Sequence, residues 1–148
     1  NVEYLYKTLA PFKKKFGVYL VQLPPNFKKD MTRLEDFIKD LPENINTAFE
    51  FRHPSWFEKE VYDLLKNYKC ALCLSDTDEA PVSELINTGG WGYLRLRRSS
   101  YTKNELSKWL KKIEMQSWKD VFIYFKHEDE GKGAKFAKEM IKITGKAK

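Results

Sequence analysis

The sequence contains little of what metal, redox and membrane proteins depend on. Its 148 residues include only two cysteines and two histidines, too few for a cluster of metal ligands drawn from several strands. The longest apolar runs have the length of strands, so no transmembrane helix is expected. The first residues mix Glu3 and Lys7 with tyrosine and leucine, unlike a signal peptide. We therefore expect a cytoplasmic protein that binds no membrane, no metal and no cofactor.

The two cysteines, Cys70 and Cys73, form a Cys-x-x-Cys pair inside one apolar stretch. This spacing occurs in zinc sites and in thioredoxin-like redox motifs. A zinc site of this kind needs a second pair, and a redox pair opens a helix, whereas Ala71–Leu74 has the character of a buried strand. Residues three apart also face opposite sides of a strand. The pattern favours two reduced, packed thiols, which fits a cytoplasmic protein.

The chain carries a net charge of +6 at neutral pH, which is compatible with a polyanionic partner. Its lysines are spread over nearly every predicted helix and are mixed with Glu and Asp, a pattern typical of solvated faces. Arginine is scarce, and four of the five arginines fall at the ends of predicted strands: Arg52, Arg95, Arg97 and Arg98. No glycine-rich phosphate loop, nucleophile elbow or His-Glu-x-x-His motif accompanies them. The arginines are therefore the better candidates for binding an anion.

The hydrophobic pattern predicts a single α/β domain over residues 1–148. Apolar segments of strand length cover Val18–Leu23, Thr47–Arg52, Cys70–Leu74, Gly92–Arg97 and Val121–Phe125. Helices are expected between them, with an opening helix through Val2, Leu5, Leu9 and Phe12 and a short helix over Pro81–Asn87. Capping boxes are predicted at Thr32 with Glu35, Ser55 with Glu58, and Thr102 with Glu105. Alternating strands and helices indicate parallel βα units, and five units make either an open sheet or part of an eight-stranded barrel.

The stretch Glu50-Phe51-Arg52-His53-Pro54-Ser55-Trp56 joins the end of a strand to the start of a helix. With Val21–Pro25, Tyr93–Arg97, and Val121–Phe125 followed by Gly131 and Ala134, it resembles the domain-of-unknown-function 72 family across nearly the whole chain. The resemblance implies a partial TIM-like (βα) barrel of five parallel strands, with the opening units of the barrel missing, and no established activity. Lys126 and His127 stand where many members have asparagines. These barrels are similar in outline to endonuclease IV, but two histidines do not supply the ligands of a metal nuclease.

Polar residues recur at the carboxyl ends of the predicted strands, where α/β proteins bind ligands. The alternation of side chains directs one set into the barrel: Gln22, Glu50, Arg52, Ser75 or Asp76, Arg95, Arg97, Tyr124 and Lys126. In one interpretation, Glu50 merely pairs with Arg52 or Arg95. In a second, the arginines grip a phosphate or carboxylate, with Gln22 and Lys126 as further ligand contacts. In a third, Glu50 or Asp76 is the general acid or base of a hydrolase or lyase beside those arginines.

Three aromatic or titratable residues near the carboxyl ends of the predicted strands have two interpretations each. His53 is a candidate catalytic proton shuttle or a hydrogen-bonding turn residue. Trp56 is a stacking platform for a ligand or part of the core, and Tyr101 is a substrate contact or an ordinary loop tyrosine. The partner is a small anionic ligand or, as the alternative function, a nucleic acid bound by a module without catalysis. Self-association through the open edge of the barrel is a further expectation.

Overall fold

The sheet has five parallel strands in sequential order. In this computed structural model, residues 4, 7–8, 11–12, 17–42, 45–126 and 131–145 are described. The strands are β1 (Val18–Gln22), β2 (Asn46–Glu50), β3 (Ala71–Asp76), β4 (Gly92–Leu96) and β5 (Val121–Phe125). They pair in the order β1-β2-β3-β4-β5, and every pair is parallel. The predicted strands and their order are confirmed, with boundaries shifted by one or two residues.

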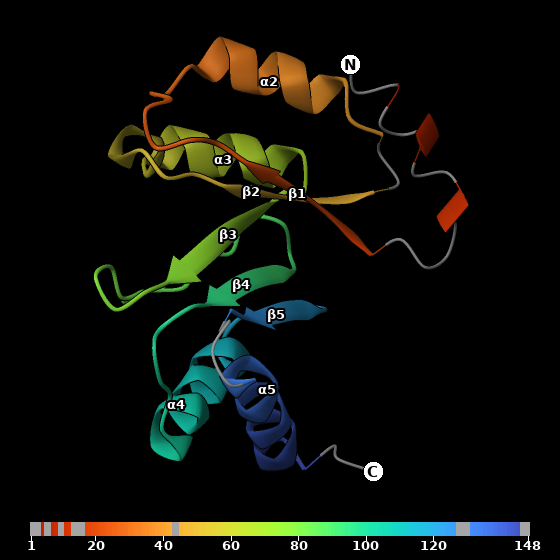
Figure 1. Ribbon diagram of the computed structural model, residues 1–148. Helices are drawn as coiled ribbons and strands as arrows, with labels where there is room; N and C mark the ends of the chain where they lie inside the picture. Colours follow the sequence, from red (N-terminus) through yellow and green to blue (C-terminus); the bar gives the residue numbers. More distant parts are fainter. Residues whose placement is uncertain are drawn as a thin grey trace.

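Helices cover one face of the sheet, which curves into a half-barrel. They are α2 (Met31–Lys39), α3 (Lys59–Asn67), α4 (Lys103–Glu114) and α5 (Lys132–Ile143), with a short 3₁₀ helix, η2 (Pro54–Trp56), after β2. Figure 1 shows α2 and α3 beside β1 and β2, and α4 and α5 beside β4 and β5, with the sheet bending between the two pairs. The fold is therefore the α/β half-barrel that the sequence predicted.

The two faces of the sheet carry different sets of side chains. The helix-facing set forms the large core, in which Phe49, Leu72 and Leu94 are almost completely buried. The inner set is smaller and becomes more polar toward the carboxyl ends of the strands. Its apolar part is formed by Ala48, Ala71, Cys73, Trp91 and Tyr93. Because successive side chains of a strand alternate between faces, each strand contributes to both.

The cysteines follow this division. Cys70 lies in the helix-facing core and Cys73 in the inner cluster. Both are buried and neither forms a disulfide. Burial raises the pKa of the Cys70 thiol to about 11 and raises that of Cys73 further. The expectation of packed thiols on opposite faces is confirmed. In the part of the chain that the structure describes, no helix is long and apolar enough to span a bilayer.

Two local predictions were wrong: the helix over residues 81–87 and the capping box of Ser55 with Glu58. Residues 81–87 form no helix but an extended loop, in which the Val82 N–H donates to the Asp76 carboxylate at 2.8 Å. The helix after β2 begins at Lys59, with Glu58 as its N-cap and no side-chain capping bond. Ser55 instead lies in η2 and accepts a hydrogen bond from the Lys29 N–H at 2.9 Å.

Of the other two predicted capping boxes, the one at Thr32 is absent and the one at Thr102 is present. Asp30, rather than Thr32, caps α2 by accepting from the Arg33 N–H. The Thr102–Glu105 capping box is present in full at the start of α4. The opening helix predicted through Val2, Leu5 and Leu9 lies mostly outside the described residues.

Candidate functional site

The inner face becomes polar at the carboxyl ends of the strands, in layers set by the strand register. Gln22 of β1 lies opposite Glu50 of β2. The next layer contains Ser75, Arg95 and Tyr124, which are register partners on β3, β4 and β5. Arg52 follows β2 on the same face, and the alternation continues past β4 and β5 to Arg97 and Lys126, whose N–H groups still bond to the neighbouring strands. The strand alternation thus places these residues on the inner face, at the carboxyl ends of the strands, which we call the mouth.

Glu50 is the centre of this mouth. Its side chain is 2% exposed, and the carboxylate lies 2.5 Å from Arg95 Nη1. The same oxygen accepts a hydrogen bond from Gln22 Nε2 at 2.6 Å, and Arg52 Nε lies 4.0 Å from the other oxygen. A buried carboxylate requires such partners, because burying an unpaired charge is costly. Glu50 therefore holds Gln22, Arg95 and Arg52 in place around the mouth.

Two polar atoms at this end of the inner face are buried and have no hydrogen-bond partner among the described residues: Ser75 Oγ and Arg97 Nε. Arg97 also has no ion-pair partner among the described residues. The positive charges of Arg95 and Arg97 oppose the rise in the pKa of the Cys73 thiol that burial and Glu50 cause. Buried polar groups are rarely left unpaired in native proteins, so these two atoms keep the capacity to form a hydrogen bond.

Asp76 lies on the other face of β3, away from Glu50. Its side chain is fully buried, and it accepts hydrogen bonds from the Val82 N–H and from the Tyr101 hydroxyl, each at 2.8 Å. Arg98 approaches the same carboxylate, with Nε 2.8 Å from Oδ2 and Nη2 donating to Oδ1 at 3.1 Å. The expected convergence of Asp76 with Glu50, Arg52 and Arg95 is therefore not found: Ser75, not Asp76, faces the mouth.

Tyr101 belongs to this second cluster as well. Its side chain is 6% exposed, and its hydroxyl accepts a hydrogen bond from the Arg98 N–H at 3.1 Å while donating to Asp76. Burial raises the pKa of Tyr101 well above its usual value of 10.0. The ring packs edge-on against Phe125 and Phe136. The structure thus gives Tyr101 the surroundings of a core residue that anchors the loop before α4.

His53 and Trp56 lie in the turn that follows β2. The Ser55 N–H donates to His53 Nδ1 at 3.2 Å, and Ser55 Oγ lies 2.9 Å from the same nitrogen. Nδ1 is therefore an acceptor occupied within the turn. Trp56 is 1% exposed, stacks on Phe51 at 4.6 Å and donates its Nε1–H to the Phe27 carbonyl at 2.8 Å. Its ring is part of the core rather than an accessible platform.

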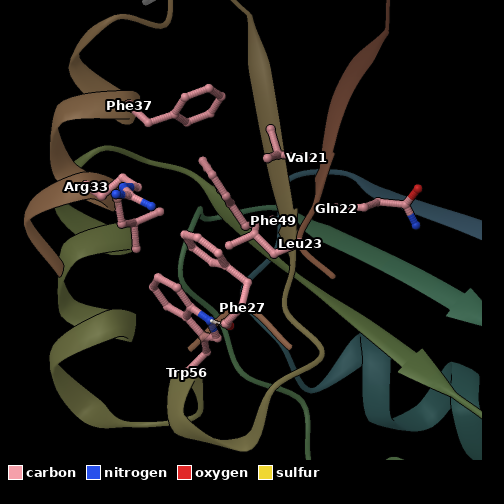
Figure 2. Close-up of a pocket in the computed structure, with 9 residues that line it drawn as sticks. Val21, Gln22, Leu23, Phe27, Arg33, Phe37, Phe49 and Trp56 are labelled. Carbon is pink, nitrogen blue, oxygen red and sulfur yellow. Dashed lines mark hydrogen bonds between the residues drawn. The ribbon is translucent and has the colours of Figure 1, made fainter. Parts of the chain in front are cut away.

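A separate apolar pocket of about 210 Å³ lies on the helix side of β1. Figure 2 shows Phe27, Phe37 and Trp56 around this pocket, while Gln22 is directed away from it, toward the inner face. Gln22 borders this pocket as well, but its side chain extends to the opposite face of β1 from those of Val21 and Leu23. The polar mouth and the apolar pocket are two different places.

Arg98, the ion-pair partner of Asp76, is a residue to which the sequence analysis assigned no role. It was noticed among the arginines at strand ends, but it was not paired with Asp76. The signal was present, because Asp76 and Arg98 both fall on the helix-facing side of the alternation. No described group of three or more His, Cys, Asp or Glu side chains is placed to hold a metal ion.

Comparisons with known proteins agree on one family. The family described as "Protein of unknown function DUF72" matches residues 1–148. The solved structure of a DUF72 family protein from Thermotoga maritima has a TM-score of 0.78 and 19% identity, and the match covers 97% of this chain and 64% of that one. A DUF72 family protein from Enterococcus faecalis has a TM-score of 0.72 and 19% identity, with 97% and 68% covered. The chain thus spans about two thirds of the length of these structures. No curated protein sequence matches it.

Proposed function

The chain belongs to the DUF72 family, whose function is unknown, and we propose that it binds a small phosphate- or carboxylate-containing ligand at the carboxyl ends of its strands. The observation that carries the proposal is the pair of buried, unpartnered atoms, Ser75 Oγ and Arg97 Nε. A guanidinium and a hydroxyl are both donors, so together they fit the oxygens of an anion.

The charge of the mouth supports an anionic ligand. Among the described residues, the three arginines Arg52, Arg95 and Arg97 face one carboxylate, that of Glu50, which leaves an excess of two positive charges. Arg52 is 44% exposed and Arg95 20% exposed on their side chains, so ligand oxygens can reach them. The guanidinium fork suits phosphate and carboxylate groups because it donates two parallel hydrogen bonds.

Binding is the function that this geometry supports best. Hydrolase or lyase chemistry would use Glu50 as the general acid or base, with His53 as proton shuttle, and Glu50 would first have to exchange Arg95 and Gln22 for the ligand. The alternative, a nucleic-acid-binding module, has weaker support, because several exposed lysines of the helices are already paired. Lys39 contacts Glu35 at 2.9 Å and Lys59 contacts Asp63 at 2.5 Å, each within one helix.

The test compares two adjacent arginines. Among the described residues Arg97 has no ion-pair partner, so Arg97→Gln should leave the fold intact while affinity for inorganic phosphate falls about 10- to 150-fold, as expected for one charge-assisted hydrogen bond. Arg98→Gln is the matched control: it breaks the ion pair with Asp76 and should lower stability while phosphate affinity changes less than about twofold. Isothermal titration calorimetry and urea unfolding measure the two effects.

Three outcomes contradict parts of this proposal. If the parent chain binds neither phosphate nor simple carboxylates, the anion site does not exist. Equal affinity of Arg97→Gln and the parent would place the ligand elsewhere. A steep log-linear loss of affinity for single-stranded or duplex nucleic acid with salt, stronger than for phosphate, would favour the nucleic-acid module.

Location and assembly are lesser parts of the proposal. The two buried, free thiols support a reducing compartment such as the cytoplasm. Among the described residues, β1 pairs on one side only, with β2, and an open edge can pair with another chain. We therefore include self-association through β1, which sedimentation over a range of concentrations tests. A chain that stays monomeric at high concentration would contradict it.

A further inference from the structure

We propose that the anionic ligand carries a planar ring that stacks on Tyr124, so that the ligand class is an aromatic phosphomonoester. This inference rests on the proposed anion site and adds the part of the ligand that the arginines do not contact. It comes from an aromatic side chain that lies beside the cations and remains half exposed.

Tyr124 is placed as a stacking surface. It lies on the inner face of β5 as the register partner of Arg95. One face of its ring rests on Tyr93, with centroids 5.1 Å apart and planes 27° from parallel. Tyr93 is itself 7% exposed, so the ring beneath is fixed by the inner cluster, whereas Tyr124 is 49% exposed. The Tyr124 ring is therefore held by a buried ring and remains half exposed.

The ring and the anion site are close enough to share one small ligand. Neighbouring strands lie about 5 Å apart, and residues two apart on a strand lie about 7 Å apart. Arg95 is opposite Tyr124 and Arg97 is two residues further along β4 on the same face. A phosphate between these two arginines therefore has Tyr124 within reach of a ring attached directly to it.

The excess of positive charge at the mouth favours a ligand whose anionic group carries two negative charges rather than one. A phosphomonoester carries up to two negative charges near neutral pH, as phosphorylated side chains do, whereas a carboxylate carries one. Arg52, Arg95 and Arg97 exceed the Glu50 carboxylate by two positive charges among the described residues, and the dianion neutralises more of this excess than a carboxylate does. A planar guanidinium also binds two phosphate oxygens at once while leaving the ester side free to face Tyr124.

Exposure of a tyrosine alone does not predict this site, and the chain offers a comparison. Tyr68 is 38% exposed, but it follows α3 and its hydroxyl lies 3.4 Å from Glu35. None of the arginines at the mouth is its partner. Tyr124 differs because it is exposed, stacked from below and in register with a cation.

The experiment measures the affinities of inorganic phosphate, ethyl phosphate and phenyl phosphate for the 148-residue chain by calorimetry. We expect phenyl phosphate to bind about 5- to 100-fold more tightly than ethyl phosphate, the range found when aromatic stacking partners are removed. Tyr124→Leu should abolish that preference and Tyr124→Phe should keep it, because stacking needs the ring and not the hydroxyl. Tyr68→Leu is the matched control and should leave all three affinities unchanged. Circular dichroism checks that each variant is folded.

The outcomes separate this inference from the anion site itself. If phosphate and both esters bind the parent with equal affinity, the ring site is wrong while the anion site stands. If Tyr124→Leu keeps the preference for phenyl phosphate, the ring stacks elsewhere and the inference is overturned. If none of the three anions binds the parent, both the inference and the proposed function fail.

Discussion

Replacing Asp76 by alanine should destabilise the protein strongly without touching the anion site. The carboxylate is fully buried and serves three partners: the Val82 N–H, the Tyr101 hydroxyl and the Arg98 guanidinium. Each buried polar group left unsatisfied costs about 1–3 kcal/mol, and removing one partner of a buried ion pair costs about 3–5 kcal/mol. Arg98 is 25% exposed and lies 3.5 Å from Glu105, so water and Glu105 offset part of its loss. We expect the free energy of unfolding to fall by about 3–5 kcal/mol.

Urea unfolding followed by circular dichroism measures this change. For a chain of this size, a loss of that magnitude lowers the melting temperature by roughly 10 °C. Asp78→Ala is the matched control: this carboxylate is exposed and accepts one hydrogen bond, from the Ser99 N–H at 2.9 Å, so its loss should cost less than about 1 kcal/mol. Phosphate affinity of Asp76→Ala should match that of the parent under conditions where both are folded.

The opposite result would refute this reasoning. If Asp76→Ala unfolds like Asp78→Ala but loses phosphate affinity or turnover, Asp76 serves the ligand, as the sequence alone suggested. A milder probe is Tyr101→Phe, which removes the hydrogen bond to Asp76 and the one accepted from the Arg98 N–H, and should cost about 1–3 kcal/mol. In a double-mutant cycle the two substitutions should be strongly non-additive, because they share this contact.

Three further predictions concern stability. Burial raises the pKa of the Cys70 thiol from 9.0 to about 11, so between these values the folded chain keeps a proton that the unfolded chain loses. The free energy of unfolding that this thiol contributes is therefore constant below pH 9 and falls by up to about 1.4 kcal/mol per pH unit between pH 9 and 11. Urea unfolding of Cys70→Ala over the same pH range should lack this fall. Thr102→Ala should lower the free energy of unfolding by about 1 kcal/mol at pH 7, because it removes the cap of α4. The hydrogen bond from the Thr102 N–H lowers the pKa of Glu105, so the stability that Glu105 contributes should be lost in acid titrations as the pH falls below about 4.5. Gly92→Ala should cost about 1–3 kcal/mol in thermal unfolding, because its Cβ would lie 2.5 Å from the Trp118 ring, and Trp118→Leu in the same chain should recover part of that cost.

The strands and the polar mouth could be predicted because both follow from alternation. Once Phe49 and Phe51 are assigned to the helix side, Glu50 and Arg52 must face inward, and the structure places them there. The same logic left Ser75 and Asp76 open, because β3 runs apolar on both faces and offers no alternation to choose between them. The structure resolves the choice through the register of Ser75 with Arg95.

Two of the errors share a cause, which is a hydrogen-bond partner outside the local sequence pattern. The loop 81–87 was predicted as a helix, but the Val82 N–H is held by Asp76, six residues earlier and at the end of a strand. Ser55 matched an N-cap pattern, but the Lys29 N–H, 26 residues earlier, uses its hydroxyl. Local patterns list what a side chain can bond, and the tertiary fold decides which bond forms.

Arg97 and Arg98 are neighbours in sequence and lie on opposite faces of the sheet, and this has a consequence for how the chain tolerates change. A shift of β4 by one residue against β3 would exchange the two arginines, which would present the wrong one to the mouth and withdraw the guanidinium from Asp76. The Asp76–Arg98 ion pair therefore favours the observed register of β3 and β4. Insertions or deletions between Leu96 and Tyr101 should accordingly be selected against even though the segment is a surface connection.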